Sequence, residues 1–366
     1  MPNRRTLLKS AAAAAGSLTL PLGAFAQERK FAPQPAGWRT FELTTRAEPN
    51  LAQGATRVWL PIPSVDNNEW QRSLESSFTT NGTATRTTDG KDGAAILVVD
   101  FDASVQQPYV ELTNRVQTRN RAVDWAKKTP AKLDAGDVEY WTRPTSLIPT
   151  DGIVRDTARK VIGDARTDED KVRRLYDWVV ANAYREPQVR GCGEGDVKTM
   201  LETGNLGGKC ADINALFVGL ARSVGIPARD VYGLRLAPSA FGYKELGSNS
   251  ASLKGAQHCR SEVFLQSRGW VAMDPADVAK VMRQETPTWI KTVDDPVVAP
   301  VYKALYGGWE GNWVAYNMAH DVALPGSRMG KLGFLMYPTA EDKQGRFDSY
   351  APDDFKYVIS AKEIKA

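Results

Sequence analysis

The 366-residue sequence is poor in the residues that usually build metal sites and membrane anchors. It contains 3 cysteines and 2 histidines, and none of them forms a Cys-x-x-Cys or His-x-x-x-His pair. Such spacings are typical of zinc sites, so a zinc site made of Cys192, Cys210, His258 and Cys259 is an alternative without support from spacing, and we expect no metal or organic cofactor. No segment approaches the roughly twenty uninterrupted apolar residues of a membrane-spanning helix, so we expect no stable membrane anchor.

Paired arginines stand near the N-terminus. Arg4 and Arg5 precede a mildly apolar stretch at 11–22, and small residues fit a cleavage site after Ala26. This arrangement resembles a twin-arginine export signal at 1–26, so we expect a periplasmic or secreted protein. The alternative is a leader that is retained and tethers the chain.

The charge of the remaining chain is close to neutral. Three of the 47 basic residues lie within 1–26, which leaves 44 basic against 43 acidic residues. A nearly neutral chain has no general attraction to nucleic acid or to a membrane surface, so we expect neither as a partner. Cleavage after Ala26 leaves 340 of the 366 residues, which is enough for two domains.

Residues 37–120 have the pattern of a β-domain. Apolar residues alternate at Phe41 and Leu43, and the runs at 95–101 and 109–116 are separated by stretches rich in Asn, Thr, Asp and Gly. Alternation and turn-rich spacing are typical of half-buried strands. We therefore predict a small β-sandwich domain at 37–120, in which we recognise no catalytic group.

A cysteine stands where a glycine-rich loop meets an amphipathic helix. After Cys210, apolar residues recur at three- and four-residue spacing, and Gly225 and Pro227 supply a stop signal. The apolar positions are Ile213, Leu216, Phe217, Leu220 and Val224. Cys210 therefore lies in the first turn, where unpaired N–H groups and the helix dipole favour thiolate and can hold an oxyanion. We expect Gly207 and Gly208 to leave room for a substrate beside the sulfur.

A histidine and an aspartate follow on a predicted hairpin. Residues 257–265 are predicted to form a strand that carries His258 near its start, and a second strand ends at Asp274. A nucleophilic thiol needs a base, and the base needs a third group that fixes its tautomer. Read alone, a strand histidine or an Asp before Pro is more often structural. Together, Cys210, His258 and Asp274 supply the three catalytic roles.

The hairpin turn decides whether the histidine and the aspartate share a face. For Asp274 to lie directly across from His258, the turn must centre on Gln266. A two-residue loop at 267–268 would place Asp274 opposite Ser261, on the other face, unless a bulge corrects the register.

These motifs resemble the transglutaminase-like superfamily of cysteine enzymes, also described as the papain-related transglutaminase core. The run Gly208–Asp212, followed by Leu220–Arg229, resembles the family's nucleophile helix and the strand after it. His258 and Glu262 resemble its histidine strand, and Gly269–Pro275 resembles its aspartate strand.

The resemblance implies an α+β fold with a catalytic domain at 148–280, a β-sandwich ahead of it, and a mixed extension at 281–366 that packs on the core. Arg260 departs from the family, because an aromatic residue usually follows the histidine by two. We interpret this arginine as a sign of an open and wet cleft. Trp309 and Trp313 are expected to pack in the core, with carbohydrate contact as the alternative.

The same resemblance implies acyl transfer on an amide bond through a thioester. Cys210 would attack the carbonyl carbon and its N–H would help hold the oxyanion, His258 would move the proton, and Asp274 would orient the imidazole. We expect a peptide or protein substrate of the cell envelope and hydrolysis by water, as in a protease or amidase. A protein-glutamine transglutaminase and a non-catalytic periplasmic binding or assembly module are the alternatives.

The other two cysteines are expected to lie away from the chemistry. If His258 faces the cleft, strand alternation directs Cys259 to the opposite side. In an oxidising compartment Cys259 could form a disulfide with Cys192, although a twin-arginine route carries chains that are already folded. Two free thiols are the alternative.

Overall fold

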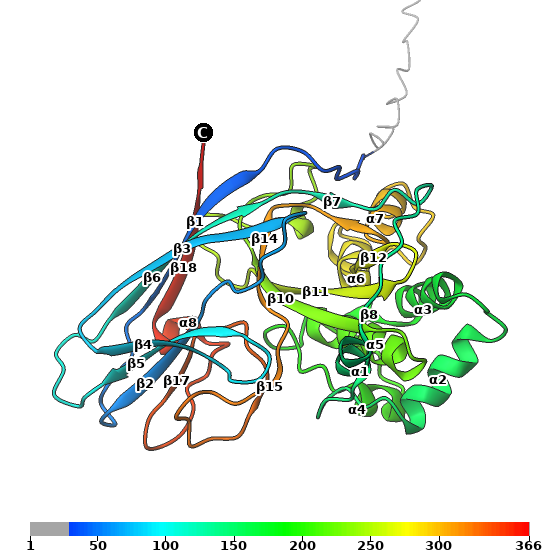
Figure 1. Ribbon diagram of the computed structural model, residues 1–366. Coiled ribbons are helices and arrows are strands. Elements are labelled where there is room, and N and C mark those ends of the chain that lie inside the picture. The colour runs from blue at the N-terminus through cyan, green and yellow to red at the C-terminus, as the bar shows by residue number, and fades with distance from the viewer. Residues whose placement is uncertain (1–28, 366) are drawn as a thin grey trace, which may run out of the picture.

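The computed structural model describes residues 29–365, and the export signal predicted at 1–26 lies outside them. Two bodies stand side by side, with antiparallel sheets at the left of Figure 1 and a helical body with its own sheet at the right. The predicted α+β class, with antiparallel sheets ahead of the helical body, is confirmed. Within residues 29–365, no helix is both long and apolar enough to cross a membrane.

Strands from both ends of the described chain form the body at the left. They are β1 (Arg39–Ala47), β2 (Thr56–Pro61), β3 (Gln71–Thr80), β4 (Thr83–Thr88), β5 (Ala95–Phe101), β6 (Val110–Thr118), β17 (Thr339–Glu341) and β18 (Tyr357–Ile364). They pair in two four-stranded antiparallel sheets, in the orders β18-β1-β6-β3 and β17-β2-β5-β4. Alternate residues such as Phe41 and Leu43 in β1 and Leu97 in β5 are buried in one shared cluster, as in a β-sandwich.

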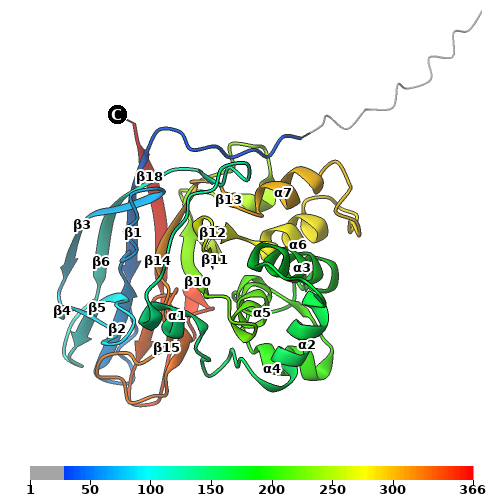
Figure 2. The same ribbon diagram turned by 45° about the vertical axis from the view of Figure 1, so that its right-hand side comes forward.

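The helical body is built on a separate antiparallel sheet. Its strands are β10 (Ala228–Arg235), β11 (Gln257–Leu265), β12 (Gly269–Met273) and β14 (Trp313–Asn317), in the order β12-β11-β10-β14. Its main helices are α2 (Gly152–Ile162), α3 (Asp168–Asn182), α4 (Val197–Thr203), α5 (Cys210–Ser223) and α6 (Pro275–Gln284). Helix α5 contacts β10 and β11 on one side and α2 and α3 on the other, so it is buried along nearly its whole length (Figure 2).

Shorter elements connect these parts. They are β7 (Arg121–Ala122), α1 (Ala135–Thr142), β8 (Tyr184–Arg185), β9 (Gly207–Gly208), the 3-10 helix η1 (Lys244–Leu246), α7 (Ala299–Ala304), β13 (Gly308–Trp309), β15 (His320–Val322), β16 (Leu332–Phe334) and α8 (Pro352–Phe355). The β8–β9 pair is parallel and stands directly before α5. It therefore fixes the loop from which the Cys210 helix begins.

The segment predicted as an extension at 281–366 supplies strands to both bodies. β14 pairs with β10 in the core sheet, whereas β17 pairs with β2 and β18 pairs with β1. Residues between β14 and β17 also cover the outer face of β2 and β5. A second hydrophobic cluster forms there from Trp59, Ile96, Val98, Val322 and Leu335.

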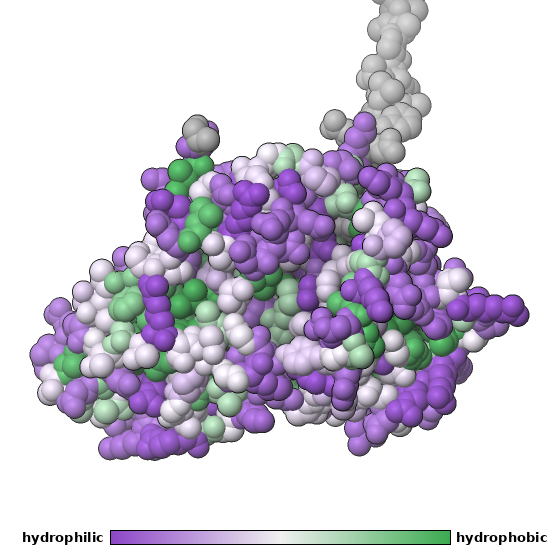
Figure 3. Space-filling model, viewed as in Figure 1, coloured by the Kyte–Doolittle hydropathy of each residue, from purple (hydrophilic) through white to green (hydrophobic). Residues whose placement is uncertain are grey.

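Few large apolar side chains are strongly exposed among the described residues. Hydrophilic side chains cover much of the helical body on the face drawn in Figure 3. The exposed large apolar side chains are Leu74, Val138, Met329 and Val358, which stand on separate elements or loops. Single exposed apolar residues are ordinary for a globular protein and indicate no docking surface.

Candidate active site

Helix α5 begins at Cys210, and Asp212 in its first turn fixes that beginning. The Asp212 carboxylate accepts hydrogen bonds from the backbone N–H groups of Lys209 (2.8 Å), Glu194 (3.0 Å) and Gly195 (2.9 Å). A carboxylate at this end of a helix is also favoured by the helix dipole. One side chain therefore ties the loop around Glu194 to the residue before the cysteine.

The glycines near Cys210 allow other side chains of the protein to approach the backbone closely. They do not leave space for a substrate. A Cβ on Gly208 would lie 2.5 Å from the Asp212 side chain, and one on Gly193, whose φ is +87°, would lie 1.8 Å from it. A Cβ on Gly207 would lie 2.5 Å from the ring of Tyr184. The expectation that Gly207 and Gly208 leave space for a substrate was wrong, because the protein's own side chains occupy that space.

The hairpin of β11 and β12 places His258 and Asp274 on one face of the sheet. Its strand register differs from both registers considered from the sequence, the one with a turn centred on Gln266 and the one with a two-residue loop at 267–268. Leu265 pairs with Gly269 and Ser261 pairs with Met273, so the loop has three residues centred on Ser267. Continued by one residue, this register sets Asp274 opposite Arg260. Because Arg260 and His258 are two residues apart, their side chains share a face, and Asp274 reaches the histidine diagonally.

His258 is held by two carboxylates. Its Nε2 donates to Oδ2 of Asp274 at 2.8 Å and lies 3.4 Å from Oδ2 of Asp277, so Nδ1 is the ring nitrogen that these carboxylates do not engage. Burial lowers the pKa of His258, but the charges of Asp277 and Asp274 outweigh burial and Arg235, and they raise this pKa to about 9. The imidazolium form is therefore favoured at neutral pH.

Asp274 has a structural contact besides its bond to the histidine. It is the N-cap of α6, and its Oδ1 accepts from the backbone N–H of Asp277 at 3.1 Å. The strand predicted to end at this residue ends at Met273, and Pro275 occupies the first helical position. Oδ2 of Asp274 also lies 3.5 Å from Nε of Arg260. Both oxygens are thus engaged.

Asp277 and Arg235 belong to the site and were missed in the sequence. Nη2 of Arg235 donates to Oδ1 of Asp277 at 2.5 Å, and both side chains are almost fully buried. Burial raises the pKa of Asp277, but Arg235 and His258 outweigh it and hold this pKa well below its usual value. The spacing of Asp277 three residues after Asp274, in the first turn of a helix that starts at Pro275, is a signal that could have found it.

Asn214 is a second missed residue. It stands one turn after Cys210, beside the apolar stripe of α5, and its side chain is fully buried. Its Nδ2 donates to the carbonyl of Cys259 at 2.8 Å and lies 3.5 Å from Oδ1 of Asp274. The amide therefore connects the cysteine helix to the histidine strand and to the aspartate. A polar residue one helical turn after the candidate nucleophile, on the same side of the helix, was the available signal.

The three cysteines lie together and are all free thiols. Burial raises the pKa of Cys210, but hydrogen bonds with Cys192, Cys259 and His258 outweigh burial and lower this pKa well below its usual value. The pKa of Cys192 is raised by its bond to Cys210 and by burial, and that of Cys259 is raised by burial and by its bond to Cys210. Cys259 was expected to point away from the chemistry, but its thiol lies close enough to Cys210 to help lower the pKa of that cysteine, and it forms no disulfide with Cys192.

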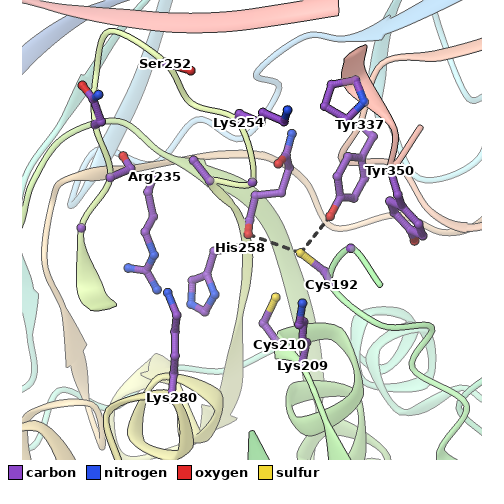
Figure 4. Close-up of a pocket in the computed structure, with 18 of the residues that line it drawn as sticks. Cys192, Lys209, Cys210, Arg235, Ser252, Lys254, His258, Lys280, Tyr337 and Tyr350 are labelled. Carbon is purple, nitrogen blue, oxygen red and sulfur yellow. Dashed lines mark hydrogen bonds between the residues drawn. The ribbon is translucent and has the colours of Figure 1, made fainter. Parts of the chain in front are cut away.

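The loop before α5 holds Cys192 beside the candidate nucleophile. The carbonyl of Cys192 accepts from the N–H of Ala211 at 2.9 Å, and its thiol donates to the carbonyl of Gln257 at 3.3 Å. The hydroxyl of Tyr337 in turn donates to the Cys192 sulfur at 3.1 Å (Figure 4). Ala211 is therefore engaged, whereas the N–H of Cys210 has no acceptor among the described contacts and is placed to hold an oxyanion.

Arg260 does not face a wet cleft. Its side chain is buried, with its guanidinium 4.6 Å from the ring centre of Trp313 and 5.2 Å from that of Trp309. Both tryptophans are 1% exposed, so carbohydrate contact by them is excluded and core packing holds. Trp313 also donates from Nε1 to the carbonyl of His258 at 2.9 Å. The interpretation of Arg260 as a substrate-side residue was wrong.

A cavity of about 440 Å³ opens beside the cysteine. Cys210 and His258 both line it, and Figure 4 shows Lys209 next to Cys210, with Arg235 and Lys280 beyond the imidazole. Asp274 lies behind His258 and does not line the cavity. The structure thus brings all three predicted residues together, with the cysteine and histidine facing the open space.

The carboxylates behind His258 could form a metal site only by giving up other partners. Among the described residues, ligand atoms of His258, Asp274 and Asp277 lie within 4.8 Å of one another. Arg235 is paired with Asp277, and Arg260 faces Asp274, so two cations already neutralise this cluster. A hydrogen-bonded charge network accounts for the grouping better than a cation does.

Residues 155–275 match the family model described as the transglutaminase-like superfamily. An uncharacterized protein of Haemophilus influenzae is 36% identical over 342 residues, which cover 89% of this chain and 90% of that protein. Among solved structures, a proposed cysteine protease from Cytophaga hutchinsonii covers 90% of this chain and 99% of its own, with a TM-score of 0.50 and 15% identity. At that identity the match shows a shared fold. Cys210, His258 and Asp274 all lie within the matched range.

Proposed function

Because the chain belongs to the transglutaminase-like superfamily, we propose that it is a cysteine hydrolase that cleaves an amide bond of a cell-envelope peptide or protein. The observation that carries the proposal is the pairing of Cys210, whose pKa is lowered, with His258, whose pKa is raised, at the wall of one cavity. A thiolate beside an imidazolium is the form from which a cysteine enzyme begins.

The proposed reaction follows from these two groups. The Cys210 thiolate attacks the amide carbonyl carbon, and the oxyanion is held by the Cys210 N–H. His258 gives its proton to the leaving nitrogen, the C–N bond breaks, and a thioester remains. His258 then takes a proton from water, the water oxygen attacks the thioester, and the C–S bond breaks to release an acid and the thiolate. Asp274 holds the imidazole throughout.

Hydrolysis is favoured over amine transfer by the charge of the cavity. Arg185, Lys209, Arg235, Lys254 and Lys280 line it, and within the described chain no Asp or Glu does. A primary amine is protonated at neutral pH, so Arg185 and Lys209, the two of these cations with no carboxylate partner in the described chain, repel it, whereas water approaches freely. A protein-glutamine transglutaminase remains the second candidate because the chemistry up to the thioester is the same.

We also propose that the protein acts in the periplasm or outside the cell, since residues 1–26 resemble a twin-arginine signal. Fusion of residues 1–26 to a reporter that is active only after export tests this. Export that is lost in an Arg4→Lys and Arg5→Lys double variant supports the proposal, and a reporter that stays inside contradicts it.

The activity is tested with the chain from residue 27 onward and a library of peptides, followed by mass spectrometry. We expect new acid termini with the wild type and none with Cys210→Ala, at rates little changed by millimolar primary amine. Incorporation of a labelled amine that depends on Cys210 and outpaces hydrolysis would favour the transglutaminase. Equal partner binding by wild type and Cys210→Ala, with no product from either, would favour a non-catalytic module.

A further inference from the structure

The cations that line the Cys210 cavity fall into two groups. Three of them are already paired with carboxylates. Arg235 is paired with Asp277, Lys280 lies 3.2 Å from Oε2 of Glu245, and Lys254 is paired with Asp353. These cations are neutralised by the protein and add little net positive charge to the cavity.

Arg185 and Lys209 form the second group. Neither has a carboxylate within 4 Å in the described part of the chain, although both line the cavity beside Cys210. Arg185 donates from Nε to Oε1 of Gln284 at 2.9 Å, which is a neutral partner that leaves its charge uncompensated. The nearby carboxylate of Asp212 is occupied by three backbone N–H groups.

These two cations oppose each other. Burial lowers the pKa of the Lys209 ammonium and the charge of Arg185 lowers it further, while the charges of Cys192, Cys210 and Asp212 oppose this shift without cancelling it. Two like charges held at one partly buried wall cost free energy unless an anion lies between or beside them. A ligand with a carboxylate would relieve this repulsion, and the forked N–H groups of an arginine suit a carboxylate well.

We propose that Arg185 and Lys209 form an anion subsite, and that the substrate is a peptide with a carboxylate close to the bond that is cleaved. This rests on the proposed function, because Lys209 directly precedes Cys210 and the subsite is placed relative to its sulfur. An acidic side chain or a free terminal carboxylate next to the scissile amide has the required chemistry. A peptide with a cationic residue at that position would be rejected by the same wall.

The subsite is tested with two alkylating reagents that differ in one group. Iodoacetate carries a carboxylate where iodoacetamide carries a neutral amide, and both alkylate the Cys210 sulfur. We expect the iodoacetate-to-iodoacetamide rate ratio to be about tenfold higher than for N-acetylcysteine, and to fall about threefold to tenfold in Arg185→Gln and in Lys209→Gln. A change of the thiol pKa in a variant affects both reagents and cancels in the ratio.

The matched control is Lys160→Gln, which removes an exposed cation of α2 outside the cavity. It should leave the ratio unchanged, and added salt should lower the ratio of the wild type. A wild-type ratio like that of N-acetylcysteine, or a ratio that both Gln variants leave unchanged, would overturn the anion subsite. In that case rapid alkylation by iodoacetamide would still support the thiolate on which the proposed function depends.

A second measurement separates the two proposals when neither reagent reacts. Calorimetry with Cys210→Ala compares N-acetylglutamate with N-acetylglutamine, which differ in the same way. If N-acetylglutamate binds more tightly than N-acetylglutamine, and Arg185→Gln removes this difference, the anion subsite is supported even if the thiol is inert. Equal binding of the two ligands overturns the subsite. Failure of the thiol alone would count against the hydrolase.

Discussion

The imidazole Nε2 of His258 lies 3.4 Å from Oδ2 of Asp277, a second carboxylate behind the histidine. Asp274 is the closer partner, but the charge of Asp277 raises the pKa of His258 more than the charge of Asp274 does, and Asp274 adds the effect of its hydrogen bond. Arg235 opposes it, since a cation near His258 lowers its pKa. The protonation of His258 therefore depends on the charges of Asp277 and Arg235, which a description of the site as Cys210, His258 and Asp274 leaves out.

The first prediction concerns the pH dependence of activity. Because the pKa of His258 is about 9, kcat/KM should fall as the pH rises through about 9 and the imidazolium is lost. Asp277→Asn should shift this fall in kcat/KM to lower pH, because it removes a charge that raises the pKa of His258. Arg235→Gln should shift it to higher pH, because it removes a charge that lowers this pKa. The measurement is kcat/KM as a function of pH for the wild type and for each folded variant. Shifts of both variants in the same direction would contradict the charge-pair account.

The second prediction concerns stability and isolates the histidine with Cys210→Ala. The pKa of His258 is about 9 in the folded chain, above its unfolded value of about 6.5, so its protonation stabilises the fold fully below about pH 6.5. This contribution, on the order of 3 kcal/mol, is lost as the pH rises through about 9. In urea unfolding experiments between pH 6 and pH 10, the free energy of unfolding of Cys210→Ala should therefore fall as the pH rises.

The Cys210→Ala background is needed because the thiol acts in the opposite sense. A thiol whose folded pKa is below its unfolded value adds stability above the unfolded pKa of about 8.5 and loses it as the pH falls through the folded pKa. In the wild type, at intermediate pH, the histidine makes the free energy of unfolding fall as the pH rises, and the thiol makes it rise. A His258→Gln, Cys210→Ala double variant is the control and should lack the decline, whereas an unchanged decline would assign it to another group.

The third prediction concerns the selectivity of thiol alkylation. At pH 6 iodoacetamide should label Cys210 first, because its pKa is lowered while those of Cys192 and Cys259 are raised. Thiols with a pKa near or above 8.5 are almost fully protonated at this pH. Peptide mapping after brief labelling gives the order, and His258→Ala should slow Cys210 at least about tenfold. Equal labelling of all three cysteines would refute the thiolate assignment.

The sequence predicted the elements whose signals are local. The helix that begins at Cys210 follows from the apolar period and the stop signal at Gly225, and the presence of the β11–β12 hairpin follows from two strand patterns separated by a turn. The pattern alone did not give the register, because three-residue and two-residue loops fit the same residues. Only the pairing of Leu265 with Gly269 decides it.

The residues that the sequence did not place depend on contacts between distant segments. Arg260 is buried against Trp309 and Trp313, which arrive about fifty residues later in the chain. Strand β18 joins β1 across more than 300 residues, and no local pattern specifies such a partner. The role of Asp277 depends on Arg235 and His258, which come from two strands and lie beside it only in the folded chain.

The last prediction separates the two contacts of Asp274. Its Oδ2 accepts from His258, and its Oδ1 accepts from the Asp277 N–H at the start of α6. Asp274→Asn keeps one carbonyl oxygen. Turned toward His258, this oxygen preserves the imidazole orientation, while the amide group then faces the donors of Asp277 and Asn214. Both Asp274→Asn and Asp274→Ala should therefore lose the helix cap, at about 1–2 kcal/mol of unfolding free energy.

The two Asp274 variants should differ in activity more than in stability. The thiolate–imidazolium pair is formed before attack, so an uncharged acceptor is enough to orient the base, and Asp274→Asn should retain at least about tenfold more kcat/KM than Asp274→Ala. Thermal unfolding of both variants confirms that folded proteins are compared. Equal activities in two folded variants would mean either that the amide turns its nitrogen to His258 or that Asp274 only caps α6. A crystal structure of Asp274→Asn decides between these, because only the first would leave His258 displaced from the amide nitrogen.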